Sequence, residues 1–198
     1  MSEIKNKLVE FIIPTYNRKE PLKSMLASLV AQTDNDWAAS VIIDNMISSE
    51  ETFASAEICN SFKDKRIKVS FTDHRYNDWG HTPREMGKQA SKADYIIMTG
   101  DDNYYTPNFV YELRKASELN PGMIYWDMVH SHYDYAYFKC TPAFNQIDMG
   151  AFATRNDLAK QIKLNTSYAA DGEFVQKFVQ KFGIKTTYKI NKVLFVHN

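Results

Sequence analysis

Two adjacent carboxylates, Asp101 and Asp102, are the side chains in this sequence best suited to chemistry, and Asn103 follows them. Neighbouring side chains within a strand point to opposite faces, but in a turn just past a strand both carboxylates can face one hard cation that prefers oxygen ligands. Protein sites for such a cation often supply one or two carboxylates and leave the remaining ligands to substrate phosphates. The alternative is a turn that merely ends a strand, because Asp and Asn favour turns through local hydrogen bonds. Taken alone, the pair leaves both interpretations open.

Two further polar clusters also follow predicted strands. Pro14–Asn17 comes after the first apolar run, and Asp44 and Asn45 come after the second. In open sheets of mostly parallel strands, ligands bind in a crevice at the carboxyl ends of the strands. The sequence therefore predicts that the three clusters share one crevice, which favours a ligand site over an ordinary turn at Asp101 and Asp102.

The elements that must position these clusters alternate between strand and helix in the first half of the chain. Short buried apolar runs indicate strands, and apolar residues recurring at helical spacing indicate amphipathic helices. This alternation predicts right-handed crossovers and a Rossmann-like, mostly parallel sheet. The predicted strands are Leu8–Ile13, Ala38–Asp44, Ile67–Thr72 and Tyr95–Thr99, and the predicted helices are Glu20–Gln32, Glu51–Phe62 and Thr82–Ala93.

The second half of the sequence has a different pattern, with short strand-prone segments separated by turn residues. We expect the sheet to become mixed there, and we expect a last strand over Lys192–Val196 that leads to His197. The predicted strands before it are Met123–Asp127, Tyr135–Cys140 and Gln146–Ala153, and the predicted helices are Thr154–Lys163 and Asp171–Phe182.

Composition narrows the class of protein. The 198 residues contain 24 Lys plus Arg and 24 Asp plus Glu, so no overall charge attracts nucleic acid or an anionic membrane. No apolar run is long enough for a membrane span, and the two cysteines, Cys59 and Cys140, lack metal-ligand spacing. We expect a cytoplasmic protein without nucleic-acid partners, folded as one domain over residues 1–198.

Three stretches together carry a resemblance to a known family. Phe11–Arg18 reads FIIPTYNR, Val41–Asn45 reads VIIDN, and Ala93–Asn103 reads ADYIIMTGDDN. Their order and spacing resemble the family 2 glycosyltransferases of GT-A fold over roughly the first 110 residues. The resemblance implies an α/β fold with a nucleotide-binding half over residues 1–103, and a half for donor sugar and acceptor over residues 104–198.

The resemblance also implies roles for residues of the first half. The donor would be a nucleotide-sugar, expected to be UDP-linked, and the cofactor Mn²⁺ or Mg²⁺. Asp44 would hydrogen-bond the base, and the loop over Asn77–Gly80 would bring Arg84 near the nucleotide, unless Arg84 is only a solvated helix residue. Asp101 and Asp102 would bind the ribose and the metal–diphosphate. Pro14, Thr15 and Tyr16 would line the nucleotide pocket.

In the second half, Asp171 matches the carboxylate that removes the proton of the acceptor hydroxyl in inverting enzymes. Its alternative role is a helix N-cap, which the same position would allow. His197 matches a metal ligand of some GT-A enzymes, where an imidazole would favour manganese, but it could also be a frayed terminal histidine. Aromatic residues of this half mostly suit a core, with Trp126 and its neighbour Asp127 expected to contact sugar. Gly150 would permit close backbone approach in a donor-sugar loop.

Two positions depart from the family pattern. Thr99 stands where the acidic motif usually has Asp, and Ala170 stands where Glu usually precedes the catalytic Asp. The second departure leaves a retaining enzyme with the same donor site as an alternative, and a non-catalytic nucleotide-sugar-binding module as another. A nucleotidyltransferase is disfavoured because Pro14–Asn17 contains no glycine to clasp a triphosphate. The acceptor is unidentified, and a second subunit of a homo-oligomer could help to bind it.

Overall fold

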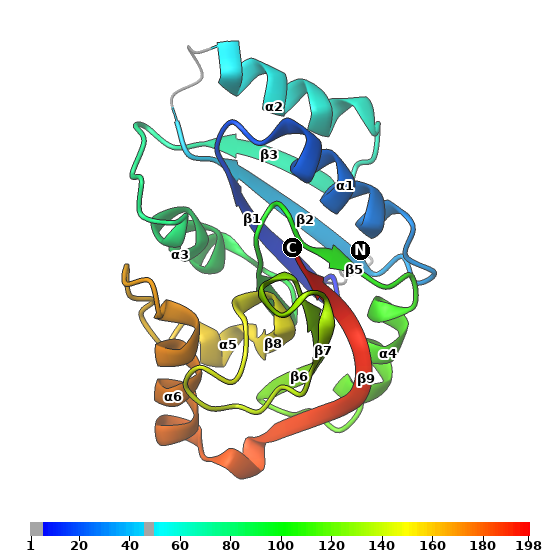
Figure 1. Ribbon diagram of the computed structural model, residues 1–198, viewed down its shortest axis with the longest axis vertical. Coiled ribbons are helices and arrows are strands. Elements are labelled where there is room, and N and C mark those ends of the chain that lie inside the picture. Colours follow the sequence, from blue (N-terminus) through cyan, green and yellow to red (C-terminus); the bar gives the residue numbers. More distant parts are fainter. Residues whose placement is uncertain (1–5, 46–49) are drawn as a thin grey trace, which may run out of the picture.

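The computed structural model describes residues 6–45 and 50–198 of the chain, and Figure 1 shows them as one curved sheet flanked by helices. The sheet has the strand order β3-β2-β1-β4-β8-β6-β9-β5, with β7 paired to β6. The principal elements are β1 (Val9–Thr15), α1 (Lys19–Val30), β2 (Trp37–Ile43), α2 (Glu50–Ser61), β3 (Ile67–Phe71), α3 (His81–Ala90), β4 (Tyr95–Met98), β5 (Tyr104–Tyr105), α4 (Phe109–Ser117), β6 (Met123–His130), β7 (Ala136–Phe138), β8 (Phe152–Arg155), α5 (Asn156–Ala159), α6 (Ala170–Phe182) and β9 (Thr187–His197).

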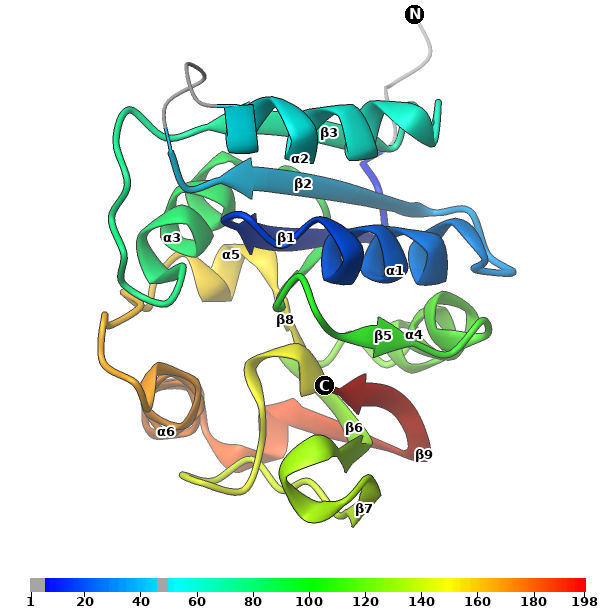
Figure 2. The ribbon, with the colours of Figure 1, turned by 45° about the horizontal axis from the view of Figure 1, so that its top comes forward.

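The first half of the sheet is parallel, as the alternating pattern predicts. Strand β1 pairs in parallel with β2 and β4, and β2 pairs in parallel with β3. Figure 2 shows α1 and α2 side by side over these strands, while α3 packs against β1, β2 and β4. Because helices cover both faces, β1 and β4 are almost wholly apolar and buried. Parallel strands bring the loops after β1, β2 and β4 to one edge.

Proline does not end β1, contrary to expectation. The strand continues to Thr15, and Pro14 pairs in register with Ile42 of β2. On the other side, the pairing of β1 with β4 stops at Ile12 opposite Met98. The missing N–H of Pro14 therefore falls beyond the end of that ladder, where a proline is tolerated.

The second half of the sheet is mixed, which confirms the expected change. Strand β8 runs antiparallel to β4 and β6, while β6 and β9 are parallel with an irregularity near Asp127. The strand predicted over Gln146–Ala153 is wrong for most of its length, because Met149–Ala151 forms a 3₁₀ turn and β8 begins at Phe152. The helix predicted over Thr154–Lys163 is reduced to α5, since its first two residues belong to β8.

An aromatic cluster joins the two halves. Phe11 of β1 packs against Tyr105 and Phe109, and Phe109 packs edge-on against Trp126 of β6 with ring centroids 4.6 Å apart. The sequence interpretation assigned no element to residues 104–117, yet β5 and α4 lie there and carry the two residues that bridge the cluster. No helix in the described part of the chain is long and apolar enough to cross a membrane.

Candidate active site

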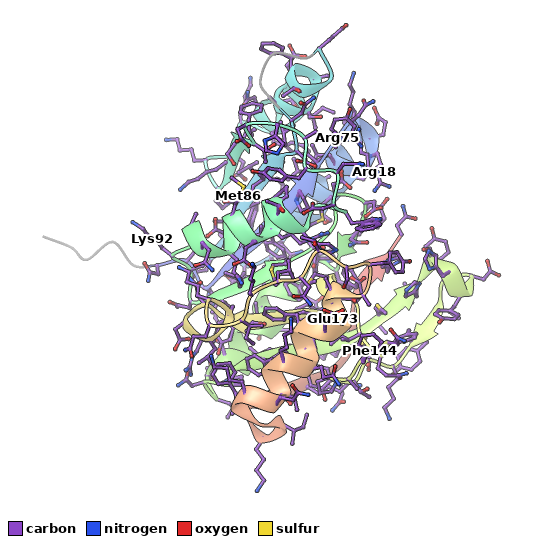
Figure 3. All side chains as sticks on the ribbon, turned by 90° about the vertical axis from the view of Figure 1, so that its left-hand side faces the viewer. Arg18, Arg75, Met86, Lys92, Phe144 and Glu173 are labelled. Atoms are coloured by element: carbon purple, nitrogen blue, oxygen red, sulfur yellow. The ribbon has the colours of Figure 1, made fainter. Side chains whose placement is uncertain are left out.

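A cavity of about 560 Å³ lies at the carboxyl edge of the parallel strands, where the sequence predicts a crevice. Its walls come from both halves of the chain. In Figure 3, Arg18 and Arg75 lie on one side of α3, and Glu173 of α6 lies on the other. The lining residues include Pro14, Thr15, Tyr16, Arg18, Asp44, Arg75, Trp79, His81, Arg84, Asp101, Asp102, His132, Asp148, Tyr168, Asp171 and His197.

The acidic pair forms the floor of one end of this cavity. The Thr15 hydroxyl donates a 2.6 Å hydrogen bond to Asp101 Oδ2. The Arg18 guanidinium lies 3.3 Å from Asp101 Oδ1 and 2.8 Å from Asp102 Oδ2. Burial raises the pKa of Asp101 to about 6, and the Thr15 and Arg18 contacts oppose that rise. Both carboxylates therefore face a single position for positive charge.

Asp44 and Tyr16 also line the cavity. The two carboxylate oxygens of Asp44 accept backbone N–H bonds from Tyr76 at 2.9 Å and Asn77 at 3.1 Å, which fixes the loop after β3. The Arg75 guanidinium of that loop stacks 3.6 Å from the centroid of the Tyr16 ring. Aromatic and guanidinium planes of this kind suit a nucleobase. The role of Asp44 in binding a base stays a prediction.

Arg84 is buried, not a solvated helix residue. Its guanidinium donates to the backbone oxygen of Trp79 at 2.8 Å and to that of Thr99 at 3.2 and 3.3 Å. Burial lowers its pKa, whereas the carboxylates of Asp148 and Asp101 favour its charged form. Arg84 thus contributes positive charge to the lining of the cavity and holds the loops before α3 and after β4.

Asp171 lies at the start of α6, which begins at Ala170 with Ala169 as its N-cap residue. Its carboxylate accepts the adjacent Gly172 N–H at 2.6 Å, and the N-cap position belongs to Ala169, so Asp171 does not cap the helix as the alternative interpretation proposed. Burial, with a smaller contribution from the nearby charge of Asp148, raises the pKa of Asp171 to about 6. A carboxylate with this pKa can accept a proton near neutral pH.

His197 lines the same cavity as the acidic pair. Its Nε2 is 3.7 Å from Asp148 Oδ2, and its ring stacks on His130 with centroids 4.0 Å apart. The backbone N–H of Asn198 donates to Asn103 at 3.3 Å, which joins the end of β9 to the turn after β4. His197 is therefore held by the fold, and its role as a metal ligand stays a prediction.

The acidic pair fits a divalent cation. Carboxylate oxygens are suitable donors, and Asp101 and Asp102 contact the two terminal nitrogens of one cationic side chain, Arg18. Within residues 6–45 and 50–198, no group of three or more His, Cys, Asp or Glu side chains converges closely enough to hold a metal. A metal here would take its remaining ligands from phosphates and water, as Mg²⁺ and Mn²⁺ commonly do.

Three residues expected at the donor sugar do not line the cavity, so these predictions are wrong. Trp126 is fully buried between Tyr105 and Phe109 and does not line the cavity, because an indole on the interior face of β6 belongs to the core. Gly150 is also buried away from the cavity. A Cβ there would lie 2.5 Å from the Phe195 ring, so the glycine permits close packing within the protein and not against a ligand. Asp127, beside Trp126, is bound to Lys189 at 2.6 Å and to the Cys140 backbone.

Several cavity residues received no role from the sequence. Arg18 ends the recognised Phe11–Arg18 stretch, and Asp148 stands two residues before Gly150 of the expected donor-sugar loop, so their positions could have been noted. Trp79 lies inside the Asn77–Gly80 loop, which was recognised for Arg84 and not for its own ring. The sequence carries no comparable signal for His81 or Tyr168, because the exposure of a ring depends on the loop that carries it.

The structure has the GT-A fold, which it shares with solved structures of similar architecture. The structure of S. aureus TarS residues 1–349 is similar, with a TM-score of 0.78 and 15% identity, covering 96% of this chain and 60% of that one. A mannosyltransferase, PcManGT from Pyrobaculum calidifontis, has a TM-score of 0.71 and 15% identity, covering 98% of this chain and 57% of that one. At these identities the likeness concerns the fold.

The chain belongs to glycosyl transferase family 2, whose model matches residues 10–167. It is 25% identical over 206 residues to an uncharacterised glycosyltransferase of Haemophilus influenzae, covering 94% of this chain and 67% of that protein. It is also 28% identical over 97 residues to a poly(ribitol-phosphate) beta-glucosyltransferase of Bacillus spizizenii, covering 48% of this chain and 15% of that enzyme. The family confirms the resemblance noted in the sequence and identifies the protein as a glycosyltransferase.

Proposed function

We propose that this glycosyltransferase moves a hexose from a UDP-linked donor to a hydroxyl acceptor, with a divalent metal at Asp101 and Asp102 and with inversion at the anomeric carbon. The observation that carries the proposal is the convergence of both carboxylates on one cation position, in the same cavity as Asp171. Similar structures support the donor class: TarS has been solved with UDP-GlcNAc, and PcManGT with GDP-Man and Mn²⁺. Residues 1–103 would bind the nucleotide, and residues 104–198 the sugar and acceptor.

In the proposed reaction, Asp171 accepts the proton of the acceptor hydroxyl while that oxygen bonds to C1 of the sugar. The bond between C1 and the phosphate oxygen breaks, and the nucleoside diphosphate leaves with the bonding electrons. Arg84 provides positive charge near the departing phosphates, where negative charge grows in the transition state. Thr15 holds Asp101 in place through its 2.6 Å hydrogen bond.

A divalent metal held by Asp101 and Asp102 would neutralise charge on the diphosphate leaving group. The pair contributes oxygen ligands, and His197 is a candidate third ligand from the same cavity. An imidazole ligand would favour manganese over magnesium.

The test is a screen of UDP- and GDP-linked sugars for manganese-dependent release of the nucleoside diphosphate, followed by NMR of the sugar product. We expect a UDP-sugar to be consumed, and a β product to form from an α-linked donor. An α product would support the retaining alternative and remove Asp171 from its role as base. Tight nucleotide binding without turnover, with acceptors supplied, would instead indicate a binding module.

A further inference from the structure

Two exposed aromatic rings lie at the cavity edge and take no part in the proposed donor site. Trp79 is 64% exposed and Tyr168 is 79% exposed, and both line the cavity that contains Asp171. Their ring centroids are 6.2 Å apart at an interplanar angle of 75°. Trp79 precedes α3 and Tyr168 precedes α6, so rings from two separate segments meet beside the candidate base.

The loop that carries Trp79 is held in a defined conformation. Trp79 has φ +57° and the next residue, Gly80, has φ +80°, a region that side chains other than glycine rarely adopt. The Trp79 backbone oxygen accepts a 2.8 Å bond from Arg84, and Asp78 accepts from the Thr82 backbone at 2.9 Å. The indole is therefore exposed by a structured turn and not by a loose one.

The segment that carries Tyr168 is likewise fixed to its neighbours. Glu173, labelled on α6 in Figure 3, accepts a 2.9 Å hydrogen bond from the Ser167 hydroxyl and a second bond from Asn165. The Leu164 backbone N–H donates to Glu85 of α3 at 3.0 Å. These bonds tie residues 164–167 to both α3 and α6, and so place Tyr168 opposite Trp79.

A buried imidazole lies beside the Trp79 ring. His81 is 7% exposed, lines the cavity, and has its ring centroid 6.4 Å from that of Trp79. Within the described part of the chain, neither ring nitrogen makes a hydrogen bond of good geometry, although the Ser167 backbone lies close. Burial, together with the nearby Arg84, lowers the pKa of His81 to about 4. A neutral imidazole with both nitrogens uncommitted can donate one hydrogen bond and accept another.

We propose that Trp79, Tyr168 and His81 form the acceptor subsite and that the acceptor is a carbohydrate bound by the face of a pyranose ring. This inference rests on the proposed function, because Asp171 defines the acceptor side of the cavity. A pyranose ring has apolar C–H faces that pack on aromatic rings, and hydroxyls that bond to groups such as His81. An aliphatic polyol has hydroxyls but no apolar ring face. The subsite should therefore bind a pyranose more tightly than a polyol.

The fluorescence of Trp79 can report ligand binding at this site. Of its three tryptophans, Trp37 and Trp126 are fully buried, so Trp79 supplies the fluorescence that an added quencher such as acrylamide can reach. Acrylamide quenching is measured while methyl β-glucoside, methyl β-galactoside or methyl N-acetyl-β-glucosaminide is added, each with and without UDP and Mn²⁺. Glycerol is the polyol control.

We expect at least one pyranoside to reduce quenching in a saturable manner, and glycerol to have no such effect. The Tyr168→Ala variant should require a roughly tenfold higher pyranoside concentration. The matched control is Tyr111→Ala, which removes a 45% exposed tyrosine of α4 that does not line the cavity. It should behave as the unaltered chain.

Failure of this inference can be told apart from failure of the proposed function. If no pyranoside protects Trp79 under any condition, or glycerol protects it equally, the acceptor subsite is wrong, whether or not calorimetry detects UDP binding. If a UDP-hexose protects Trp79 beyond UDP alone and no pyranoside competes, the rings contact the donor sugar and the inference is also wrong. Pyranoside protection without any UDP binding would overturn the donor site and leave the carbohydrate subsite standing.

Discussion

At the scale of single residues, the raised pKa of Asp171 suits the proposed base and also lowers the stability of the folded chain. Its pKa of about 6 lies above the usual 3.8 because burial disfavours the charged carboxylate. Between these values the folded protein binds more protons than the unfolded chain, so this residue lowers stability as pH rises from about 4 to about 6. Above about pH 6 the loss of stability due to Asp171 is complete. The residue proposed as the base is therefore buried at the expense of stability.

The Asp171→Asn variant should lose transfer activity by about 10²- to 10⁴-fold, because it cannot accept a proton. It should also be more stable at pH 7 by about 1 to 2 kcal/mol, since the neutral amide avoids the cost of a buried charge. Thermal unfolding at pH 7 and below pH 4 checks the second expectation, and the difference should vanish in acid. A variant that is less stable at pH 7 would contradict the assigned pKa shift.

Arg18 occupies the cation position of the acidic pair and should compete with a divalent metal for it. The Arg18→Ala variant is expected to bind Mn²⁺ several-fold more tightly in the absence of nucleotide, because the carboxylates lose their neutralising partner. Titration followed by the EPR signal of free Mn²⁺ measures this. Arg155→Ala is the control, because Arg155 pairs with Asp157 and does not line the cavity. Weaker Mn²⁺ binding by Arg18→Ala would show that the two cations do not share the position.

At the scale of elements, the placement of α3 depends on a glycine in the helix. A Cβ at Gly87 would lie 2.5 Å from the Ile12 side chain and 2.9 Å from that of Ile42, so α3 packs directly on β1 and β2. The same helix carries Arg84 and follows the Trp79 turn. The close packing at Gly87 therefore sets the positions of the Arg84 guanidinium and of the Trp79 ring.

The Gly87→Ala variant should lower the free energy of unfolding by about 1 to 3 kcal/mol, because the added methyl group overpacks the helix–sheet contact. Urea unfolding followed by circular dichroism measures the change. Met86→Ala on the exposed side of the same helix, labelled in Figure 3, should change stability by less than about 0.5 kcal/mol. Equal effects of the two substitutions would contradict the packing argument.

Elements with strong local patterns could be predicted, whereas those set by long-range contacts could not. The buried apolar runs of β1, β2 and β4 are unambiguous in the sequence, and so are the polar residues that follow them. The two-residue strand β5 exists only because it pairs with β9, some 90 residues later in the chain. The 3₁₀ turn at Met149–Ala151 forms because Asp148 accepts the Gly150 N–H, which interrupts a segment of strand-like composition.

The same distinction applies to the candidate site. Motif residues such as Asp101 and Asp102 could be placed in one cavity from their positions after strands. Trp126 could not be separated from Trp79 by residue type, because both are tryptophans and only the fold buries one and exposes the other. Burial and exposure of aromatic rings are properties of the assembled structure.

At the scale of the whole molecule, the cavity exists because two sheet halves of different topology meet. The parallel half supplies the acidic pair, Asp44 and Arg84, while the mixed half supplies Asp148 and Asp171. The central claim is that Asp101 and Asp102 join a divalent metal to the diphosphate of a nucleotide between these halves.

Calorimetry of UDP binding with Mn²⁺ and with EDTA, for the unaltered chain and for Asp101→Asn and Asp102→Asn, tests this claim most directly. We expect Mn²⁺ to strengthen UDP binding at least about tenfold in the unaltered chain, and this gain to disappear in both variants while their thermal unfolding remains cooperative. If EDTA leaves UDP affinity unchanged, or if both variants keep the full manganese-dependent gain, the proposed metal–diphosphate site is wrong.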